Sequence, residues 1–250
     1  MCCIGLYDII SIGFKGKKIS VSCNIPGIPC DERNLAFLAA RCFYENLGKN
    51  NGLNISIEKH IPVGSGLGGG SSNAASVLLF LNNYYQEPFS QKDLMLMGLS
   101  IGADIPFHIF KKPGIATGIG GKLKAFERLD RFWVVLIYPG FSVSTEMIYK
   151  NLDLGLTICK KKVKKFLLNK QVFNPEKHLC NDLEIVAVSK YPEISEAKKA
   201  LLIYGAKGAL MSGSGSAVFG LFDDFNKAEG ARRAVLKKYK WNVYLTDMLI

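Results

Sequence analysis

Pro62 to Ala75 reads P-V-G-S-G-L-G-G-G-S-S-N-A-A, and an apolar run, Ser76 to Leu81, follows directly. Glycine adopts positive φ freely and lets a ligand approach the backbone. Such a loop leaves backbone N–H groups unpaired, and a helix behind it adds the positive end of its dipole. These features predict an anion site, with phosphate as the best-fitting anion. The alternative is a flexible turn into a core helix.

Two standard phosphate motifs do not explain this loop. The Walker pattern fails because no lysine follows the glycines. The dinucleotide pattern G-x-G-x-x-G is matched by Gly64, Gly66 and Gly69, but it requires a buried parallel strand before it and an acidic residue after the next strand. Residues 53–58 alternate as a half-exposed strand does, and Pro62 intervenes. A Rossmann fold is therefore disfavoured.

The loop instead resembles the phosphate loop of the GHMP kinases, the superfamily of galactokinase, homoserine kinase, mevalonate kinase and phosphomevalonate kinase. Residues 66–75 are most similar to the 4-diphosphocytidyl-2-C-methyl-D-erythritol kinases. The resemblance implies an α+β fold in two lobes, a ribosomal-protein-like N-terminal lobe over residues 1–126 and a ferredoxin-like α+β C-terminal lobe over 127–250. The active site is expected between the two lobes.

Asp104 lies in the sequence G-A-D-I-P-F, directly after an expected helix end at Gly102. From the local sequence it is either a cap or turn carboxylate or a partly buried general base. The 4-diphosphocytidyl-2-C-methyl-D-erythritol kinases carry Gly-Ala-Asp-(small apolar)-Pro here, and their aspartate is catalytic. The resemblance therefore implies that Asp104 accepts a hydroxyl proton. His108, in an apolar strand-like run, is interpreted as structural.

Met211 to Ser216 reads M-S-G-S-G-S. Alone it could be a plain tight turn, but it resembles the third GHMP motif, a glycine-rich loop that folds over the active site. Thr145 and Tyr149 resemble substrate contacts of the family, although Tyr149 could equally pack on the following helix. Residues 114–121 form a further glycine-rich segment, expected as a hairpin or a loop at a domain junction.

The resemblance assigns these residues to binding and catalysis. The expected nucleotide site comprises Asn34, Lys59, Pro62, Val63, Gly64, Ser65, Gly66, Leu67, Gly68, Gly69, Gly70, Ser71 and Ser72. Asn34 and Lys59 are expected near the adenosine, and Ser72 as a contact of Mg²⁺. The expected substrate site comprises Asp104, Thr145, Tyr149, Gly213, Ser214 and Gly215. The cofactors implied are ATP and Mg²⁺.

The remaining elements are expected from periodicity and punctuation. An antiparallel hairpin is predicted within residues 7–24, followed by a helix from Asp31 or Glu32 to near Gly48. A central buried helix begins at Ser71 or Ser72, and a capping box at Ser90 starts the next helix. Further elements are a strand over 132–138, helices within 153–203, a helix through Ala228 and Val235, and a final strand near 242–245.

The 250 residues are 48% hydrophobic and 21% charged, which fits one large or two small globular domains. No apolar run is long enough to cross a bilayer, and no signal-peptide pattern opens the chain. Seven cysteines show no metal-ligand spacing, so zinc is disfavoured. They are expected as reduced thiols in the cytoplasm.

The net charge of +11 can steer anionic small molecules or bind nucleic acid. The densest cluster, the lysines within residues 160–165, has no aromatic residues between them, and we interpret it as a solvated helix face. The expected partner is a small cytidine-diphosphate-linked molecule, with no nucleic acid and no membrane. The chain is expected as a monomer or a homodimer.

The opening of the chain departs from the family. Residues 1–24 hold neither Pro-Ala-Lys-(Leu/Ile)-Asn nor Gly-Tyr-His, whose lysine assists the catalytic aspartate in this family. We interpret the sequence as truncated by a misassigned start inside the first domain, with a true fragment and a loss of activity as alternatives.

The expected reaction is ATP-dependent phosphorylation of the 2-hydroxyl of 4-diphosphocytidyl-2-C-methyl-D-erythritol in the non-mevalonate isoprenoid pathway. One alternative is another GHMP kinase, of homoserine or mevalonate type. A second alternative, from a different class, is a non-catalytic nucleotide-binding protein. A nucleic-acid-binding protein is a more distant third.

Overall fold

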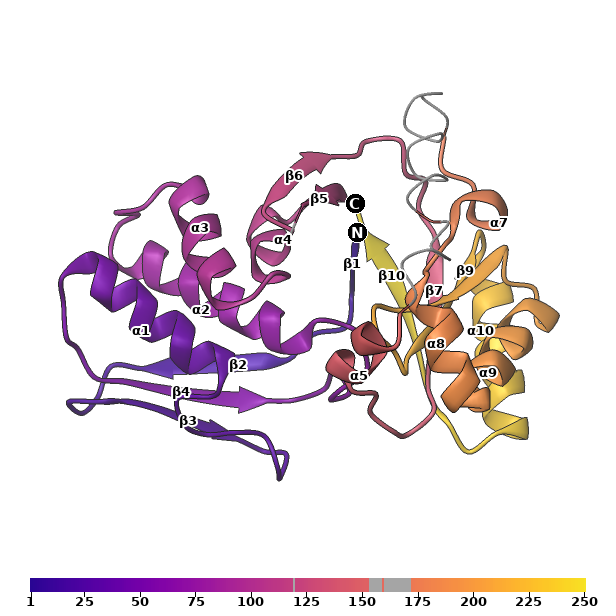
Figure 1. The fold of residues 1–250 in the computed structure, drawn as a ribbon, viewed down its shortest axis with the longest axis horizontal. Coiled ribbons are helices and arrows are strands. Elements are labelled where there is room, and N and C mark those ends of the chain that lie inside the picture. The colour runs from indigo at the N-terminus through magenta and orange to yellow at the C-terminus, as the bar shows by residue number, and fades with distance from the viewer. Residues whose placement is uncertain (119, 153–158, 160–171) are drawn as a thin grey trace. The chain divides into compact units, whose positions relative to one another are not determined.

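The computed structural model describes residues 1–118, 120–152, 159 and 172–250. These residues form two compact units. The first unit comprises Met1–Ile61 and Gly68–Phe126, and the second comprises Pro62–Leu67 and Glu127–Ile250. Each unit holds both helices and strands (Figure 1), which confirms the predicted α+β class. The lysine cluster at residues 160–165 lies outside the described residues.

The first unit is a small sheet covered by helices, with a separate pair of strands at its end. Its elements are β1 (Cys3–Ile4), β2 (Ile9–Gly13), β3 (Ile19–Cys23), α1 (Leu35–Leu47), β4 (Leu53–Glu58), α2 (Gly69–Tyr84), α3 (Gln91–Ile101), α4 (Ile105–Phe110), β5 (Gly114–Thr117) and β6 (Lys122–Ala125). The antiparallel pair β5–β6 confirms the hairpin expected over the second glycine-rich segment.

The sheet of the first unit has the strand order β2-β4-β3. β2 runs antiparallel to β4, and β3 runs parallel to it. The hairpin predicted within residues 7–24 is therefore wrong, because β4 lies between its two strands. β4 is central since Leu53, Ile55 and Ile57 are all buried and alternate with exposed polar residues. The parallel pair β3–β4 needs a crossover connection, which α1 provides.

α1 and α2 cover one face of this sheet (Figure 1). Phe43 of α1 and Leu78 of α2 are fully buried in the core beneath them. α2 also packs against α3 and α4, so the prediction of a central helix is confirmed. It is not buried all round, however, because Phe80 and Tyr84 are exposed and stack with Phe14.

The helix ends follow capping chemistry. α1 begins after Asn34, whose side chain accepts a hydrogen bond from the Ala36 N–H. The predicted start at Asp31 or Glu32 is therefore wrong, while the predicted end at Gly48 is confirmed by its left-handed backbone. α3 begins with the predicted capping box and ends at Gly102, as expected.

A buried ion pair fixes the end of β4. The Lys59 ammonium pairs with the Asp8 carboxylate, and their side chains are 7% and 0% exposed. The same carboxylate accepts hydrogen bonds from the N–H groups of His60 and Ile61, both at 2.8 Å. Asp8 therefore holds both the cation and the backbone that leads into the glycine-rich loop.

The second unit is a sheet with helices packed against it. Its elements are β7 (Trp133–Tyr138), α5 (Thr145–Lys150), α7 (Pro175–His178), α8 (Leu183–Lys190), α9 (Pro192–Ile203), β8 (Gly208–Met211), β9 (Val218–Phe222), α10 (Phe225–Lys238) and β10 (Asn242–Leu249). β7 agrees with the strand predicted over 132–138, and α8 and α9 lie within the range 153–203 where helices were predicted.

Within the second unit the strand order is β10-β7-β9-β8, and each adjacent pair is antiparallel. α9 and α10 pack on this sheet (Figure 1). They bury Leu201 and Val235 against strand residues such as Ile137. β10 is longer than the predicted strand near 242–245, because its pairing with β7 continues to Asp247.

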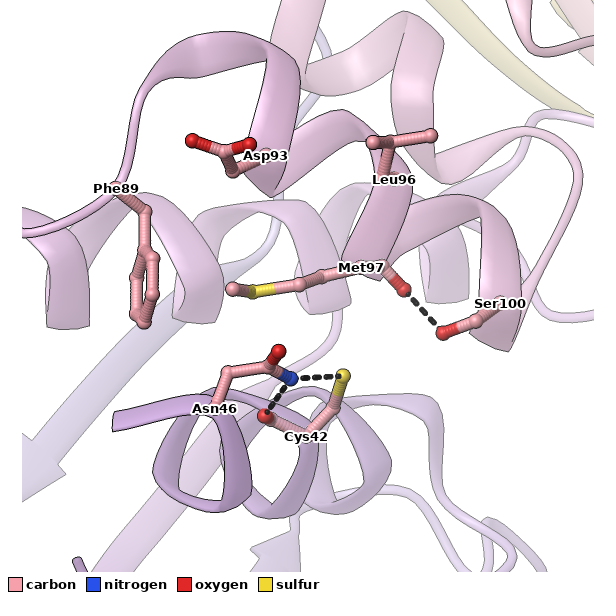
Figure 2. A pocket seen from close by; sticks show the side chains of 7 residues that line it. All are labelled: Cys42, Asn46, Phe89, Asp93, Leu96, Met97 and Ser100. Atoms are coloured by element: carbon pink, nitrogen blue, oxygen red, sulfur yellow. Dashed lines mark hydrogen bonds between the residues drawn. The ribbon is translucent and has the colours of Figure 1, made fainter. Parts of the chain in front are cut away.

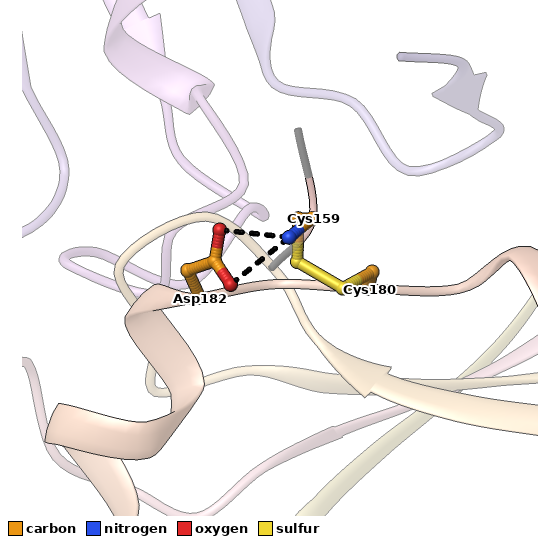
Figure 3. Close-up of side chains that lie close together, drawn as sticks. All are labelled: Cys159, Cys180 and Asp182. Atoms are coloured by element: carbon orange, nitrogen blue, oxygen red, sulfur yellow. Dashed lines mark hydrogen bonds between the residues drawn. A yellow bond between two sulfur atoms is a disulfide. The ribbon is translucent and has the colours of Figure 1, made fainter. Parts of the chain in front are cut away.

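Cys159 and Cys180 form a disulfide, with their Cα atoms 5.5 Å apart (Figure 3). The prediction of reduced thiols throughout is therefore wrong for this pair. The two residues are 21 positions apart, and only the fold brings them together. Among the described residues, the other five cysteines are free thiols. Within the same residues, no helix combines the length and the apolar character that crossing a membrane requires.

We predict that Asp8→Asn lowers the free energy of unfolding by about 3–5 kcal/mol, because it leaves the buried Lys59 ammonium without its counter-charge. Urea denaturation followed by circular dichroism measures this loss. Replacing both partners, Asp8→Asn with Lys59→Met, should recover part of it, since no unpaired charge then remains.

The matched control is Glu58→Gln, which removes an exposed carboxylate that contacts the His60 ring at 3.2 Å. Its expected effect is within about 0.5 kcal/mol, as for other surface substitutions. Equal losses for Asp8→Asn and Glu58→Gln would contradict the structural role of the Asp8–Lys59 pair.

Candidate functional site

The glycine-rich loop begins in the second unit. Pro62–Leu67 packs with that unit, whereas Gly68 and the helix behind it belong to the first. Gly64 and Gly66 have positive φ values of 63° and 76°. A Cβ atom on Gly66 would lie 2.1 Å from the Ser212 carbonyl oxygen, so no other residue fits there.

Residues 212–217 hold this first half of the loop. The Ser212 hydroxyl donates to the Gly66 carbonyl at 3.0 Å, across a separation of 146 residues. The Ala217 N–H donates to the Ser65 carbonyl, also at 3.0 Å. The glycine-rich loop and the M-S-G-S-G-S segment are therefore in direct contact within the second unit.

The second half of the loop is the start of α2. Gly68 is its N-cap residue, with a left-handed backbone (φ 70°) and no side-chain cap. The predicted cap at Ser71 or Ser72 is therefore wrong, because Gly68 turns the chain and places both serines in the first helical turn. An uncapped start leaves its first N–H groups free to bind an anion at the positive end of the dipole.

Two residues predicted to bind the nucleotide lie beside this helix start. The Lys59 Nζ lies 3.0 Å from the position that a Cβ on Gly69 would take. Asn34 is 9% exposed, and its amide donates to the Pro29 carbonyl at 2.7 Å. Its neighbour Leu35 lies 3.4 Å from the Cβ position of Gly70. The side chains of Asn34 and Lys59 therefore both have structural partners within the first unit.

Asp104 is the residue before α4, and its carboxylate caps nothing. The residue is exposed, so the expectation that its side chain is partly buried is wrong. The physical reason is its place: Gly102 ends α3, and the chain turns at the surface before Pro106 enters α4. α4 packs against α2, so Asp104, directly before α4, precedes a helix that contacts the helix behind the glycine-rich loop.

His108 lies on α4, not in the strand-like run that its neighbours suggested. Its Nε2 is 3.0 Å from the position that a Cβ on Gly68 would take. Burial lowers the pKa of His108, and the nearby Asp104 carboxylate raises it in part. The His108 imidazole lies against the start of α2, and its proximity to Gly68 was not apparent from the sequence.

The residues predicted for the substrate lie in the second unit. Thr145 Oγ1 and Ser214 Oγ are 2.8 Å apart. Gly213 and Gly215 have positive φ values of 52° and 90°, which shape the loop around Ser214. Tyr149 follows Thr145 by one turn of α5 and is 59% exposed. The structure thus joins Thr145 to Ser214 and leaves the Tyr149 ring accessible.

Asn181 was not among the residues predicted for the site. Its amide nitrogen donates to the carbonyl oxygens of Met211 and Gly213, at 2.9 Å and 2.8 Å. The pattern N-D-L at residues 181–183 marks the helix start but carries no sign of these distant partners. Asp8 was missed for the same reason, because its partners are distant in sequence.

Two other features of the described residues are separate from these groups. A pocket of about 390 Å³ lies between α1 and α3 (Figure 2), and none of the predicted site residues lines it. Cys159, Cys180 and Asp182 place three possible metal-ligand atoms within 4.8 Å of one another (Figure 3). The two sulfurs are bonded to each other there, so they are not thiolate ligands.

Two family models match the chain. The GHMP kinases N terminal domain matches residues 34–112, and the GHMP kinases C terminal domain matches residues 168–240. Among solved structures, a 4-(cytidine 5'-diphospho)-2C-methyl-D-erythritol kinase is similar with a TM-score of 0.78 at 30% identity, over 99% of this chain and 88% of that one. A homoserine kinase from Cytophaga hutchinsonii shares the fold at 19% identity with a TM-score of 0.78, over 96% of this chain and 84% of that one.

Curated relatives extend the similarity over nearly the whole chain. The 4-diphosphocytidyl-2-C-methyl-D-erythritol kinase of Syntrophotalea carbinolica is 43% identical over 98% of this chain and 87% of its own length. That of Syntrophus aciditrophicus is 42% identical over 96% of this chain and 86% of its own length. The chain therefore belongs to the GHMP kinase superfamily and, within it, to the 4-diphosphocytidyl-2-C-methyl-D-erythritol kinase family.

Proposed function

We propose that this chain phosphorylates the 2-hydroxyl of 4-diphosphocytidyl-2-C-methyl-D-erythritol, a step of the non-mevalonate isoprenoid pathway. ATP is the phosphoryl donor, as it is throughout the GHMP kinases. The acceptor is inferred from the name of the relatives at 42% and 43% identity. The observation that carries the proposal is the uncapped start of α2, with a lysine and the helix after Asp104 packed beside it.

The phosphate groups of ATP bind along residues 64–72. The N–H groups at the start of α2 donate to phosphate oxygens, and the helix dipole favours their negative charge. The Lys59 ammonium, which Asp8 pairs with, lies 3.0 Å from the Cβ position of Gly69 and so places a cation close to these donors. Asn34, near Gly70, and the remaining loop residues 62 and 63 complete the proposed nucleotide site.

Mg²⁺ fits the same helix start. Ser72 lies in the first turn of α2, and no hydroxyl hydrogen bond is found for it within the described residues. Hydroxyl and phosphate oxygens are ligands that Mg²⁺ accepts, usually together with water. When bound, the ion neutralises charge on the β- and γ-phosphates. We therefore propose Ser72 as its protein contact.

Asp104 acts as the general base. It accepts the proton of the 2-hydroxyl while that oxygen bonds to the γ-phosphorus and the bond from the γ-phosphorus to the bridging oxygen of ADP breaks. Phosphoryl transfer of this kind depends mainly on positioning and charge stabilisation, so the carboxylate need not be strongly basic. Its exposed position leaves it accessible to an incoming hydroxyl.

The acceptor binds to the residues predicted for the substrate in the second unit. We propose that Thr145 and Ser214 offer hydroxyl groups, and that Gly213 and Gly215 let the substrate approach the loop backbone. The exposed Tyr149 ring suits stacking against a base such as cytosine. We also propose residues 1–126 and 127–250 as the two domains, with Pro62–Leu67 packed against the second.

The first test measures ADP release with ATP, Mg²⁺ and a set of acceptors. We expect turnover with 4-diphosphocytidyl-2-C-methyl-D-erythritol and none with homoserine or mevalonate. Turnover with one of the latter would instead assign the chain to another kinase of the superfamily. ATP binding by a folded chain without turnover on any acceptor would support the non-catalytic alternative.

Asp104→Asn should reduce kcat by about 10²–10⁴-fold, because the amide cannot accept the hydroxyl proton. The KM for ATP should change little, since Asp104 makes no contact with the nucleotide in this proposal. Steady-state kinetics measure both constants. Asp130→Asn, another exposed aspartate, is the control and should retain full activity. Equal kcat values for the two variants would exclude Asp104 as the base.

Gly68→Ala should raise the KM for ATP about tenfold, which corresponds to ~1.4 kcal/mol. Its Cβ would meet His108 Nε2 at 3.0 Å on a left-handed backbone, so the start of α2 must shift. The control is Gly230→Ala in α10, where a Cβ meets nothing within 4 Å. That change should leave the KM unaltered and stabilise the fold by up to about 1 kcal/mol.

A further inference from the structure

We propose that Asn181 is a positioning residue for the reaction, because it fixes the 212–217 segment that holds the first half of the phosphate loop. The inference rests on the proposed function and extends it to a residue outside the expected nucleotide and substrate sites. Asn181 precedes α8 and is distant in sequence from the loop at residues 62–75 and from the segment at residues 211–216.

The Asn181 side chain serves two purposes at once. Its oxygen accepts the Leu183 N–H at 3.1 Å, which stabilises the start of α8. Its nitrogen donates to the Met211 and Gly213 carbonyls at 2.9 Å and 2.8 Å. An amide nitrogen carries two N–H donors, so these two carbonyls use its full donor capacity.

A second residue of α8 supports the same segment. The Glu184 carboxylate accepts the Met211 N–H at 2.8 Å and pairs with the Lys198 ammonium. Its side chain is only 14% exposed. The start of α8 therefore binds Met211 through both its N–H and its C=O groups, which fixes the end of β8 where the 212–217 segment begins.

The 212–217 segment in turn fixes the position of Gly66 in the phosphate loop. Ser212 follows Met211 directly, and its hydroxyl donates to the Gly66 carbonyl at 3.0 Å. Gly213, the second partner of Asn181, packs against Gly66, since a Cβ there would lie 2.8 Å from the Gly66 carbonyl oxygen. A displacement of residues 211–213 therefore displaces Gly66, and small misplacements of a catalytic group cost as much as ~10²-fold in rate.

Two substitutions distinguish the role of Asn181 at the start of α8 from its role in holding residues 211–213. Asn181→Asp keeps an oxygen for the Leu183 N–H but replaces the two donors by an acceptor that faces two carbonyl oxygens. Asn181→Ala removes both functions. If Asn181 only stabilises α8, the aspartate variant should behave like the wild type and the alanine variant should not. If Asn181 positions the loop, both variants should be impaired, and Asn181→Asp at least as much as Asn181→Ala.

We expect the affinity for ATP, measured by titration calorimetry, to fall about tenfold or more in Asn181→Asp, and kcat/KM for ATP to fall by up to ~10²-fold. The matched control is Asn174→Asp at the start of α7. Asn174 likewise accepts a backbone N–H, that of Lys177, but within the described residues its amide donates no hydrogen bond to a loop. This control should keep the wild-type affinity and rate.

Ser212→Ala provides an independent test, because it breaks the contact with Gly66 and leaves Asn181 intact. It should weaken ATP binding in the same direction, and it decides the question if an Asn181 variant does not fold. Wild-type ATP affinity in folded Asn181→Asp, or in Ser212→Ala when the former is unfolded, would overturn the inference. Wild-type protein that binds ATP but phosphorylates no acceptor would overturn the proposed function alone, because calorimetry still tests Asn181.

Discussion

The helix α2 starts without a side-chain cap, and a buried ion pair, Lys59 with Asp8, lies beside this start. A lysine beside the N-terminus of a helix is unfavourable, because both are positive. Asp8 offsets this unfavourable contact, since its fully buried carboxylate pairs with Lys59 and also accepts two backbone N–H groups. The pair thus keeps a cation next to the free N–H groups of the helix, an arrangement that a bound phosphate would stabilise further.

The second unit contributes backbone geometry rather than charge. Gly66 approaches the 212–217 segment so closely that a Cβ would lie 2.1 Å from the Ser212 carbonyl oxygen. The hydroxyl of Ser212 and the N–H of Ala217 donate to two successive loop carbonyls. The amide of Asn181 donates to the carbonyls of Met211 and Gly213 in the same segment. Glycine is therefore required at position 66 for two reasons: its φ is positive, and the two backbones approach too closely for a Cβ atom.

Local signals in the sequence predicted local structure well but not the partners that folding brings together. The capping box at Ser90 follows from a short-range pattern. Alternation in residues 7–24 indicates two strands, yet nothing there shows that β4 inserts between them. In the candidate site, the glycine-rich loop and Asp104 stand out as motifs, whereas the exposure of Asp104 depends on how α3 and α4 meet. The local sequence gives no sign of the ion pair of Asp8 or of the contacts of Asn181 with residues 211 and 213, since these partners are distant in sequence.

The distribution of burial fits the chemistry that we propose. Buried polar side chains, such as Asp8 and Ser216, hold the backbone of the loops, whereas Asp104 and Tyr149 remain exposed. A base that needed a strongly raised pKa would have to be buried. Phosphoryl transfer asks mainly for fixed donors and a correctly placed acceptor of the proton. The hydrogen-bonded loop residues and an accessible carboxylate fit these two requirements, so the exposure of Asp104 agrees with its proposed role.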